Sequence, residues 1–530
     1  MLFRSANEII VSVWDPTDEG MQARSKQVTD PGGIWYTPVS GIWQTVWLEA
    51  VNDVYFDNVY PVPDIENEQV QIHYDLDQPR KSDVVKVTVS FDGDVILKKE
   101  FPSLADMVLD IEEPKLWTPE FPHLYDLNLQ LIRRGNVLDE VDSYFAMRSV
   151  SKGKDENGFE RIMLNGEPVF NYGPLDQGWW PDGLLTPPSD EAMKYDIEVL
   201  KEMGFNTIRK HIKVEPSRYY YWTDKLGMLV WQDMPSGFVR AERDVQHVKP
   251  DWDEDWDRPE ESARQFEKEL KAMIENLKFF PSINVWVVFN EGWGQYETKR
   301  LTDFTISLDD TRIINSTSGW TDRGLGDMND AHQYPGPGME PVEENPGRII
   351  VLGEFGGLGH PVENHLWAPE RRNWGYRTYT EQDVLIKEYA NLMHHLKSMK
   401  HLGLAAAIYT QTTDVEIEVN GLMTYDREVI KIPVDLLRVL HTDLYKEDVD
   451  KAEFVIMDSE VQEGTLSMVN DGEQIVEVDA PVTVDEGGSI KAKESFVLDG
   501  EVPENIGFKV YAEGDIKVFL NGQLVMNKYI

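Results

Sequence analysis

The chain has 530 residues, which is long enough for three or four domains with cores of their own. Acidic residues number 95 against 51 basic ones, and this net charge of −44 makes nucleic acids and anionic membrane surfaces poor partners. The chain has no cysteine, which excludes disulfides, thiolate metal ligands and a cysteine nucleophile.

No stretch of the sequence is apolar over enough residues to cross a membrane, so we expect a soluble protein. No signal peptide opens the chain, but the start looks incomplete. An extracellular, periplasmic or cytoplasmic location therefore stays open, and so does an oligomeric state.

Residues 1–50 contain three strand-like runs, NEIIVSVWD, GIWYTPVS and TVWLEAV, which Gly, Pro and Asp separate. Residues 51–148 continue with apolar residues at every second position, as in VVKVTVSFDG and LYDLNLQLI. This alternation, with turn signals between the runs, predicts an antiparallel β-sandwich of about seven strands.

From residue 149 to residue 446, strand-like runs alternate with amphipathic helical runs. Met193, Ile197, Leu200 and Met203 share one face of a predicted helix, which Ser189 is placed to cap. Eight strand-like runs alternating with helices predict a (β/α)₈ barrel. The runs are VFNYG, FNTIRKH, MLVWQDM, INVWVVFNE, RIINSTS, DAHQY, IIVLGEF and LAAAIYTQ. The alternative, an open doubly wound sheet, would need a glycine-rich phosphate turn after its first strand, and the sequence has none.

Residues 447–530 return to a β pattern, as in GTLSMVND and IKVFLNGQLV. We expect a separate C-terminal β domain there, possessing no chemistry of its own and cut short at its end. The fold class predicted for the whole chain is therefore multidomain, with β domains around an α/β barrel.

In a barrel of this kind, catalytic side chains project from the carboxyl ends of the strands. The candidates are the polar residues at those ends, namely Asp176, Arg209, His211, Asp233, Asn290, Glu291, His332, Tyr334, Glu354, Gln411 and Asp414. Glu291 ends VWVVFNE and Glu354 ends IIVLGEF, and each follows a strongly apolar strand and precedes glycine. Because the fourth and seventh strands lie roughly across the barrel, we expect both carboxylates to face one cavity.

Two carboxylates that face each other across a pocket serve glycoside hydrolysis, one as nucleophile and one as proton donor. A single glutamate after a strand is ordinarily a solvated loop residue, but two at matching strand ends argue against coincidence. His332 and Arg209 each have a structural interpretation as well, and the acidic run at 251–261 is interpreted as a solvated loop. Trp320 and Trp367 are candidates to stack on a sugar ring.

Five stretches together resemble glycoside hydrolase family 2, the group of β-galactosidases, β-glucuronidases and β-mannosidases, over residues 1 to about 445. They are SGIWQTVWLE at 40–49, DSYFAMRSV at 142–150, NTIRKH at 206–211, FNEGWG at 289–294 and LGEFGG at 352–357. The resemblance implies four domains: part of a sugar-binding jelly roll (1–50), an immunoglobulin-like β-sandwich (51–148), a catalytic TIM barrel (149–446) and the C-terminal β domain (447–530). The chain is expected to lack most of the jelly roll.

The resemblance also implies roles for individual residues. Glu291 is expected to be the acid/base and Glu354 the nucleophile, with Asn290 binding the sugar 2-hydroxyl and Tyr334 donating a hydrogen bond to the nucleophile. The other expected substrate-binding residues are Arg209, His211, Asp176, His332, Trp320, Trp367 and Gln411. No cofactor is required for this chemistry, although some relatives use Mg²⁺ or Na⁺, and either ion stays an open alternative here.

The expected function is that of a retaining exo-β-glycosidase acting on oligosaccharides or polysaccharide-derived glycans, with β-galactosides as the favoured substrates. After the eighth strand, YTQTTDVEIEVNGLMTYDRE lacks the Asn-x-Lys pair with which family glucuronidases hold a carboxylate. The alternatives are a β-glucuronidase, a β-galacturonidase or a β-mannosidase. From a different functional class, a non-catalytic carbohydrate-binding protein is the rival hypothesis.

Overall fold

The structure is a computed structural model that describes residues 8–237 and 247–446, together with five strands between residues 466 and 528. The chain divides into two compact units, one of Met1–Tyr445 with Glu513–Ile530 and one of Lys446–Ala512. In the second unit, β21 (Leu466–Asn470) pairs with β22 (Gln474–Val478) and β23 (Lys491–Lys493). β24 (Ile516–Leu520) and β25 (Gln523–Lys528) form a hairpin, and the rest of the predicted C-terminal β domain lies outside the described residues.

The three runs predicted as strands in residues 1–50 are not strands in the part that the structure describes, residues 8–50. This segment forms only isolated bridges, between Gln27 and Tyr36 and between Gly32 and Trp35. A strand needs a neighbouring strand to take its backbone hydrogen bonds, and here backbone N–H groups donate to barrel loops instead, as at Ser236 O. The alternation of apolar residues was therefore misleading in this segment.

Residues 56–145 form the predicted sandwich of seven antiparallel strands in two sheets. One sheet has the order β1-β2-β5 and the other β4-β3-β6-β7. The strands are β1 (Phe56–Asp64), β2 (Gln69–Leu76), β3 (Val84–Phe91), β4 (Asp94–Pro102), β5 (Met107–Asp110), β6 (Tyr125–Arg133) and β7 (Asn136–Phe145). Val85, Val87 and Val89 alternate into the core between the sheets, which is why the period of two predicted them correctly.

All eight predicted barrel strands are present, and they close into one parallel barrel in chain order. They are β11 (Asn171–Asp176), β12 (Thr207–Lys210), β13 (Leu229–Asp233), β14 (Ile283–Asn290), β15 (Ile313–Ser318), β16 (Met328–Gln333), β17 (Ile349–Gly356) and β20 (Leu404–Thr410). A small sheet of β8 (Val150–Lys154), β9 (Glu160–Leu164) and β10 (Glu167–Pro168) packs Ile162 against apolar side chains of the barrel interior.

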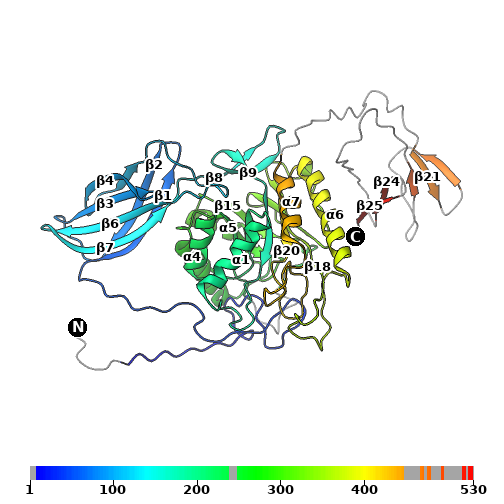
Figure 1. The fold of residues 1–530 in the computed structure, drawn as a ribbon, viewed down its shortest axis with the longest axis horizontal. Coiled ribbons are helices and arrows are strands. Elements are labelled where there is room, and N and C mark those ends of the chain that lie inside the picture. The colour runs from blue at the N-terminus through cyan, green and yellow to red at the C-terminus, as the bar shows by residue number, and fades with distance from the viewer. Residues whose placement is uncertain are drawn as a thin grey trace. The chain divides into compact units, whose positions relative to one another are not determined.

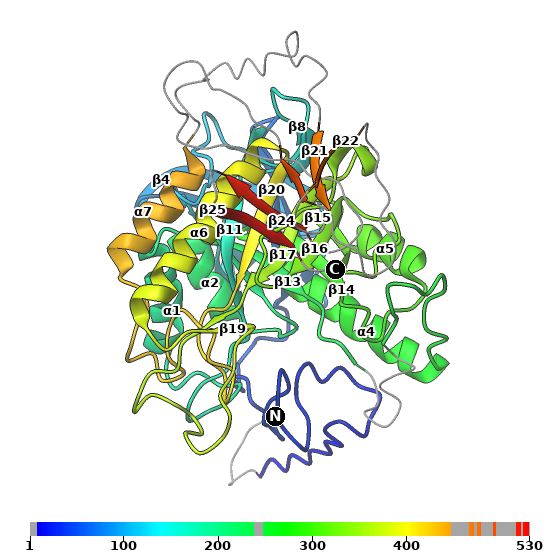
Figure 2. The ribbon, with the colours of Figure 1, turned by 90° about the vertical axis from the view of Figure 1, so that its right-hand side faces the viewer.

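Helices cover the outside of the barrel, as Figures 1 and 2 show. They are α1 (Asp190–Glu202), α2 (Ser217–Leu226), α4 (Glu260–Leu277), α5 (Thr298–Leu308), α6 (Gln382–His401) and α7 (Val434–Tyr445). Ser189 caps α1 as predicted, because its Oγ accepts the Ala192 N–H at 3.1 Å. Only α7 was not predicted.

The strands place polar side chains at one end of the barrel axis. Trp231, Val285, Val287, Val351 and Ile408 belong to the apolar cluster that fills the barrel interior. Successive residues of a strand point to opposite faces, so Ile208 packs outward against the helices while Arg209 points inward. The carboxyl ends of the strands therefore carry the polar groups that could form a site.

The N-terminal segment and the loop after β20 lie at this same end of the barrel. In Figures 1 and 2 the dark-blue N-terminal segment runs past the end of the barrel where β18 (Leu358–Gly359) and β19 (Arg377–Thr378) lie. Hydrogen bonds fix the segment there, since Thr37 N–H donates to Glu416 Oε1 at 2.6 Å and Tyr36 OH donates to Glu418 Oε2 at 2.5 Å. Both acceptors belong to the loop after β20.

Candidate active site

Glu291 and Glu354 face each other at the carboxyl end of the barrel, with His332 between them. His332 Nδ1 lies 2.9 Å from Glu291 Oε1 and 3.6 Å from Glu354 Oε2. An oxygen atom of each carboxylate and a ring nitrogen of His332 all lie within 4.8 Å of one another. The two carboxylates therefore lie close together at one end of the barrel, as we expected from the sequence.

The backbone turns sharply at Glu291, and this turn aims its side chain. β14 is buried throughout its length and ends at Asn290, after which Glu291 has φ of +52° and Gly292 has φ of +73°. A Cβ at residue 292 would lie 2.3 Å from Val248 O, so only glycine fits this second left-handed position. The Glu291 N–H donates to Ser318 O at 2.8 Å, which anchors the turn to the next strand.

Glu354 is a buried carboxylate held by donors on both sides. Tyr334 OH donates to Oε2 at 2.6 Å, and Arg209 Nη1 lies 3.5 Å from Oε1. The Tyr334 ring stacks on Tyr376 with centroids 3.6 Å apart, and its hydroxyl also meets Thr410 Oγ1 at 2.7 Å. Burial raises the pKa of Glu354, but the charges of His332 and Arg209 oppose that rise, and the pKa lies below its ordinary value. The group is therefore ionised at neutral pH.

Arg209 is the hub that connects the strands at this end of the barrel. Its side chain is fully buried and donates to Asp233 from Nε and Nη2, to Asn290 Oδ1 at 2.8 Å and to Gly353 O at 3.0 Å. Burial lowers the pKa of Arg209, yet the carboxylates of Asp233 and Glu354 raise it above its ordinary value, so the guanidinium stays charged. Arg209 thus positions Asn290 and supplies positive charge beside Glu354.

His332 lies between the two glutamates, and their negative charges favour its protonated form. Burial lowers its pKa, but the carboxylates of Glu354, Glu291 and Asp330 outweigh burial and raise that pKa above the ordinary value. Its Nε2 lies 2.7 Å from Ser318 Oγ, which in turn donates to Asp330 at 2.6 Å. Asp330 Oδ1 also accepts the Gly353 N–H at 2.6 Å, so this chain of hydrogen bonds ends next to Glu354.

The structure places the other predicted residues in different surroundings. Trp320 lies edge-on to His332 with centroids 5.7 Å apart, and its indole is about half exposed at the site. His211 lies behind the site, with Nδ1 2.9 Å from Asp233 Oδ2, and burial followed by the charge of Lys26 lowers its pKa well below the ordinary value. Gln411 is fully buried and bonds to Gln177 and Asn420.

Asp176 and Trp367 each contact residues other than the two glutamates. Asp176 belongs to a buried ionic cluster in which it accepts from Lys210 Nζ at 2.6 Å, because residues 172 and 176 lie on the face of β11 that points away from the barrel axis. Trp367 lies edge-on to Tyr425 and lines a small hollow with Trp179 and Trp180. Neither residue contacts either glutamate in the described part of the chain, so their predicted roles in binding substrate stay predictions.

Several residues at the site were not predicted from the sequence. They are Lys26, Tyr36, Ser318, Asp330, Tyr376, Thr410 and Glu418. Ser318 and Asp330 belong to barrel strands, and Thr410 ends one, so the search of strand ends could have found them. Lys26 and Tyr36 belong to a segment without strands, and no motif in the sequence marks them.

In the part of the chain that the structure describes, two groups of three side chains could be considered as cation sites, and the chemistry of neither favours one. Glu291, His332 and Glu354 offer ligand atoms close enough to hold an ion, as do His365, Asp426 and Glu428 in the loops. Mg²⁺ and Na⁺ prefer oxygen ligands, whereas the first group is centred on a histidine, with the Arg209 guanidinium beside Glu354. In the second group, His365 Nδ1 already forms a 2.8 Å hydrogen bond with Asp426 Oδ2.

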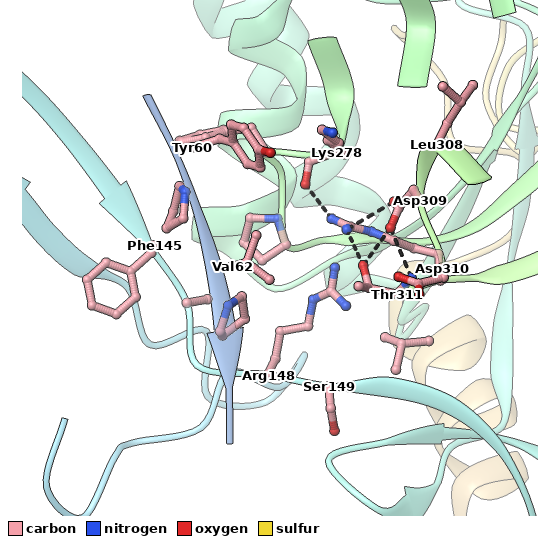
Figure 3. A pocket seen from close by; sticks show the side chains of 17 residues that line it. Tyr60, Val62, Phe145, Arg148, Ser149, Lys278, Leu308, Asp309, Asp310 and Thr311 are labelled. Carbon is pink, nitrogen blue, oxygen red and sulfur yellow. Dashed lines mark hydrogen bonds and ion pairs between the residues drawn. The ribbon is translucent and has the colours of Figure 1, made fainter. Parts of the chain in front are cut away.

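A separate cavity lies away from the two glutamates. It has a volume of about 380 Å³ and lies between the sandwich and the amino ends of β14 and β15. Figure 3 shows Tyr60 and Val62 of β1 on one side and Lys278 and Asp309 of the barrel on the other. Since barrel enzymes carry their reacting groups at the carboxyl ends, we assign this cavity to the junction between the two domains.

Comparison with known families agrees with this geometry. The model for "Glycosyl hydrolases family 2, TIM barrel domain" matches residues 188–334, and the model for "Glycosyl hydrolases family 2" matches residues 54–148. The chain belongs to glycoside hydrolase family 2. The two matches fall on the barrel and on the sandwich, so the resemblance found in the sequence is confirmed.

Curated relatives in this family carry several activities. A putative β-glucuronidase of Formosa agariphila is 29% identical over 301 residues, which are 55% of this chain and 27% of the relative. A β-galactosidase of Thermoanaerobacter pseudethanolicus is 25% identical over 303 residues, which are 52% of this chain and 36% of the relative. The matched segments therefore span only about a quarter to a third of those relatives, and their names do not favour a galactoside over a glucuronide.

Solved structures show the same fold. The FMN-binding β-glucuronidase from "Facaelibacterium prausnitzii L2-6" matches with a TM-score of 0.58 at 20% identity, covering 75% of this chain and 64% of that one. A Bacteroides uniformis β-glucuronidase matches with a TM-score of 0.59 at 21% identity, covering 78% of this chain and 54% of that one.

Among the described residues, no helix combines the length and the apolar composition that crossing a membrane requires.

Tyr334→Phe tests the donor that holds Glu354. The substitution removes the 2.6 Å hydrogen bond but keeps the ring stacked on Tyr376, so the fold should stay intact. A hydrogen bond to a charged group contributes ~1.5–3 kcal/mol, so we expect kcat for an aryl β-glycoside to fall ~10- to 100-fold. Tyr60→Phe, in the sandwich, is the matched control. Equal kcat values for the Tyr334 variant and the parent would contradict a role for this hydroxyl.

Proposed function

We propose that this chain is a retaining β-glycosidase that hydrolyses terminal β-linked sugars, with Glu354 as nucleophile and Glu291 as acid/base. The observation that carries the proposal is the pair of carboxylates at the ends of β14 and β17, whose facing oxygens lie within 4.8 Å of each other. Inverting enzymes keep their carboxyl groups ~6.5–9.5 Å apart to admit a water, whereas retaining ones stand ~5–5.5 Å apart. The shorter separation supports direct attack on the sugar.

The environment of each glutamate supports its role. Glu354 is ionised and held by Tyr334 and Arg209, so one oxygen can attack the anomeric carbon while the donors fix the carboxylate in place. Glu291 would then protonate the leaving oxygen. After the leaving group departs, Glu291 would take a proton from water, and that water would release the sugar from Glu354. His332, which contacts both carboxylates, positions them and offsets their mutual repulsion.

Asn290 is expected to recognise the sugar rather than take part in proton transfer. Its Oδ1 accepts from Arg209 Nη2, so the Nδ2 group is the end that can donate to a sugar hydroxyl. A bond to the 2-hydroxyl that strengthens in the transition state would contribute to the rate. Trp320, half exposed beside His332, offers a ring face or edge to the bound sugar.

The sugar and the rest of the substrate are less constrained. The sequence favoured β-galactosides because no Asn-x-Lys pair follows the eighth strand, but the relatives include glucuronidases, galactosidases and mannosidases. We therefore state the proposal for terminal β-linked sugars of oligosaccharides, without a required cofactor. The rival function is sugar binding without catalysis, and the ionised, fully supported Glu354 favours catalysis.

The stereochemistry of the first product tests the proposal. If Glu354 attacks the sugar directly, two inversions follow and the released sugar keeps the β configuration. We expect proton NMR spectra recorded early in the hydrolysis of an aryl β-glycoside to show the β anomer before mutarotation produces the α anomer. An α anomer appearing first would contradict the double displacement, and binding without any product would support the rival function.

A further inference from the structure

Lys26 is a mostly buried lysine that the N-terminal segment brings to the carboxyl end of the barrel. Its backbone is tied on both sides, because Arg24 and Ser25 donate to Ser236 O at 3.0 and 3.1 Å and Lys26 O accepts the Tyr36 N–H at 2.9 Å. Ser236 follows β13 by three residues, so the barrel itself fixes this turn. The side chain of Lys26 is only 8% exposed.

The Lys26 ammonium lies among the ionisable groups of the site. Its Nζ is 5.6 Å from the centroid of the Tyr36 ring, and Tyr36 OH in turn donates to Glu418. Burial raises the pKa of Glu418 and the charge of Lys26 opposes that rise, just as it helps to hold the pKa of Glu354 low. The ammonium therefore lies beside Tyr36, whose hydroxyl bonds to Glu418 in the loop after β20, and its charge favours the ionised forms of Glu418 and Glu354.

Lys26 differs from every other buried lysine in the described residues 8–237 and 247–446. The other four each have a carboxylate oxygen close to Nζ. These pairs are Lys210–Asp176 at 2.6 Å, Lys213–Glu215 at 2.7 Å, Lys397–Asp443 at 2.8 Å and Lys431–Asp414 at 2.5 Å. Within those residues Lys26 Nζ has neither a hydrogen-bond acceptor nor an ion-pair partner, so the carboxylate of a ligand could take that place.

We propose that Lys26 is a substrate-binding residue whose ammonium binds the carboxylate of a terminal β-linked uronic acid at this site. The proposal rests on the proposed function, since it places the anomeric carbon of that sugar at Glu354. A uronic acid brings the carboxylate that Lys26 lacks, and a charged hydrogen bond there would offset the repulsion from Glu291, Glu354 and Glu418. The cation comes from the N-terminal segment, so the missing Asn-x-Lys pair after β20 does not exclude a uronide.

A competing interpretation is that Lys26 only balances the negative charge of the carboxylates around it. The two interpretations differ in their dependence on substrate. Charge balance affects every sugar alike, because Glu354 acts on all of them. Recognition of a carboxylate affects only sugars that carry one.

The experiment uses the full chain and two pairs of nitrophenyl β-glycosides that differ only at C6, galacturonide with galactoside and glucuronide with glucoside. We expect the parent protein to prefer the uronide in at least one pair. Lys26→Met, which keeps the length and removes the charge, should lower kcat/KM for that uronide ~10- to 100-fold and change the neutral partner less than about threefold. Lys26→Arg should retain part of the preference, and Lys98→Met, an exposed lysine of β4, is the control for net charge.

Each outcome decides between the interpretations. Equal losses on uronide and neutral sugar would support charge balance and overturn the proposal, as would a parent protein that cleaves only neutral sugars. Melting temperature checks the fold, and we expect Lys26→Met to melt close to the parent temperature because Lys26 Nζ has no hydrogen bond or ion pair to lose within the described residues.

Binding separates this proposal from the proposed function. In a titration of free galacturonic or glucuronic acid, heat that Lys26→Met abolishes would support recognition even if the chain cleaved no glycoside. Such a result would reject the proposed catalysis but not the role of Lys26 in binding. Absence of both binding and cleavage of any uronide would reject the role of Lys26.

Discussion

Glu354→Gln is expected to lower kcat for every β-glycoside by ~10⁴-fold or more, because an amide cannot form the covalent sugar ester. Glutamine keeps the shape of the side chain and its single oxygen can still accept from Tyr334, so the variant should fold like the parent. The loss should not depend on the leaving group, since the nucleophile is needed before any leaving group departs. Initial rates with a series of aryl β-glycosides measure this.

The control for Glu354→Gln is Glu363→Gln, an exposed glutamate in the loop after β17 that makes the same change in charge. A second readout is covalent trapping. A 2-deoxy-2-fluoro aryl glycoside of the preferred sugar slows release of the sugar, so mass spectrometry should find it attached to the peptide that contains Glu354. A label on another residue, or full activity of the glutamine variant, would reject Glu354 as the nucleophile.

Glu291→Ala should produce a loss that depends on the leaving group. General acid catalysis contributes ~10²–10⁴-fold, and a poor leaving group such as a sugar needs all of it, whereas an activated aryl group needs little. We therefore expect kcat/KM for an oligosaccharide to fall ~10²–10⁴-fold, while attack on a dinitrophenyl glycoside is nearly unaffected. Removing the side chain also leaves room beside His332 and Gly319, which lie next to Glu291.

Azide tests whether a small nucleophile can use the space that Glu291→Ala leaves. It needs no base to attack the glycosyl-enzyme, so it should restore turnover of activated substrates by Glu291→Ala and give a β-glycosyl azide. Glu340→Ala, an exposed glutamate, is the control and should show neither the loss nor the rescue. If Glu291→Ala and Glu354→Gln responded identically to the leaving group and to azide, the assignment of two separate roles would fail.

The barrel and the two glutamates could be predicted because their signals are local. β14 and β17 are runs of buried apolar residues, and a carboxylate after such a run needs either solvent or a use. Alternation with helices gives the parallel order, and that order brings Glu291 and Glu354 to the same end. In the sandwich the period of two worked because each strand has one face in the core, as with Val85 and Val87.

The same signal was misleading in residues 8–50, where alternating apolar residues have no neighbouring strand. Ile10 and Trp47 remain largely exposed, whereas Trp35 packs edge-on against Trp293 of the barrel. Alternation shows which side chains could share a face, but only pairing of backbone groups makes a strand. That pairing is a property of distant segments and cannot be read from the run itself.

By itself, the sequence determined the family, the eight strands and the pair of carboxylates, because motifs and periodicity depend on neighbouring residues. The tertiary structure alone decided that Arg209 joins Asp233, Asn290 and Glu354, and that Asp176 pairs with Lys210 away from the barrel axis. It also brought Lys26 beside residues more than three hundred positions away along the chain. The charge around a carboxylate is set by distance in space, and folding fixes those distances between segments that the sequence keeps far apart.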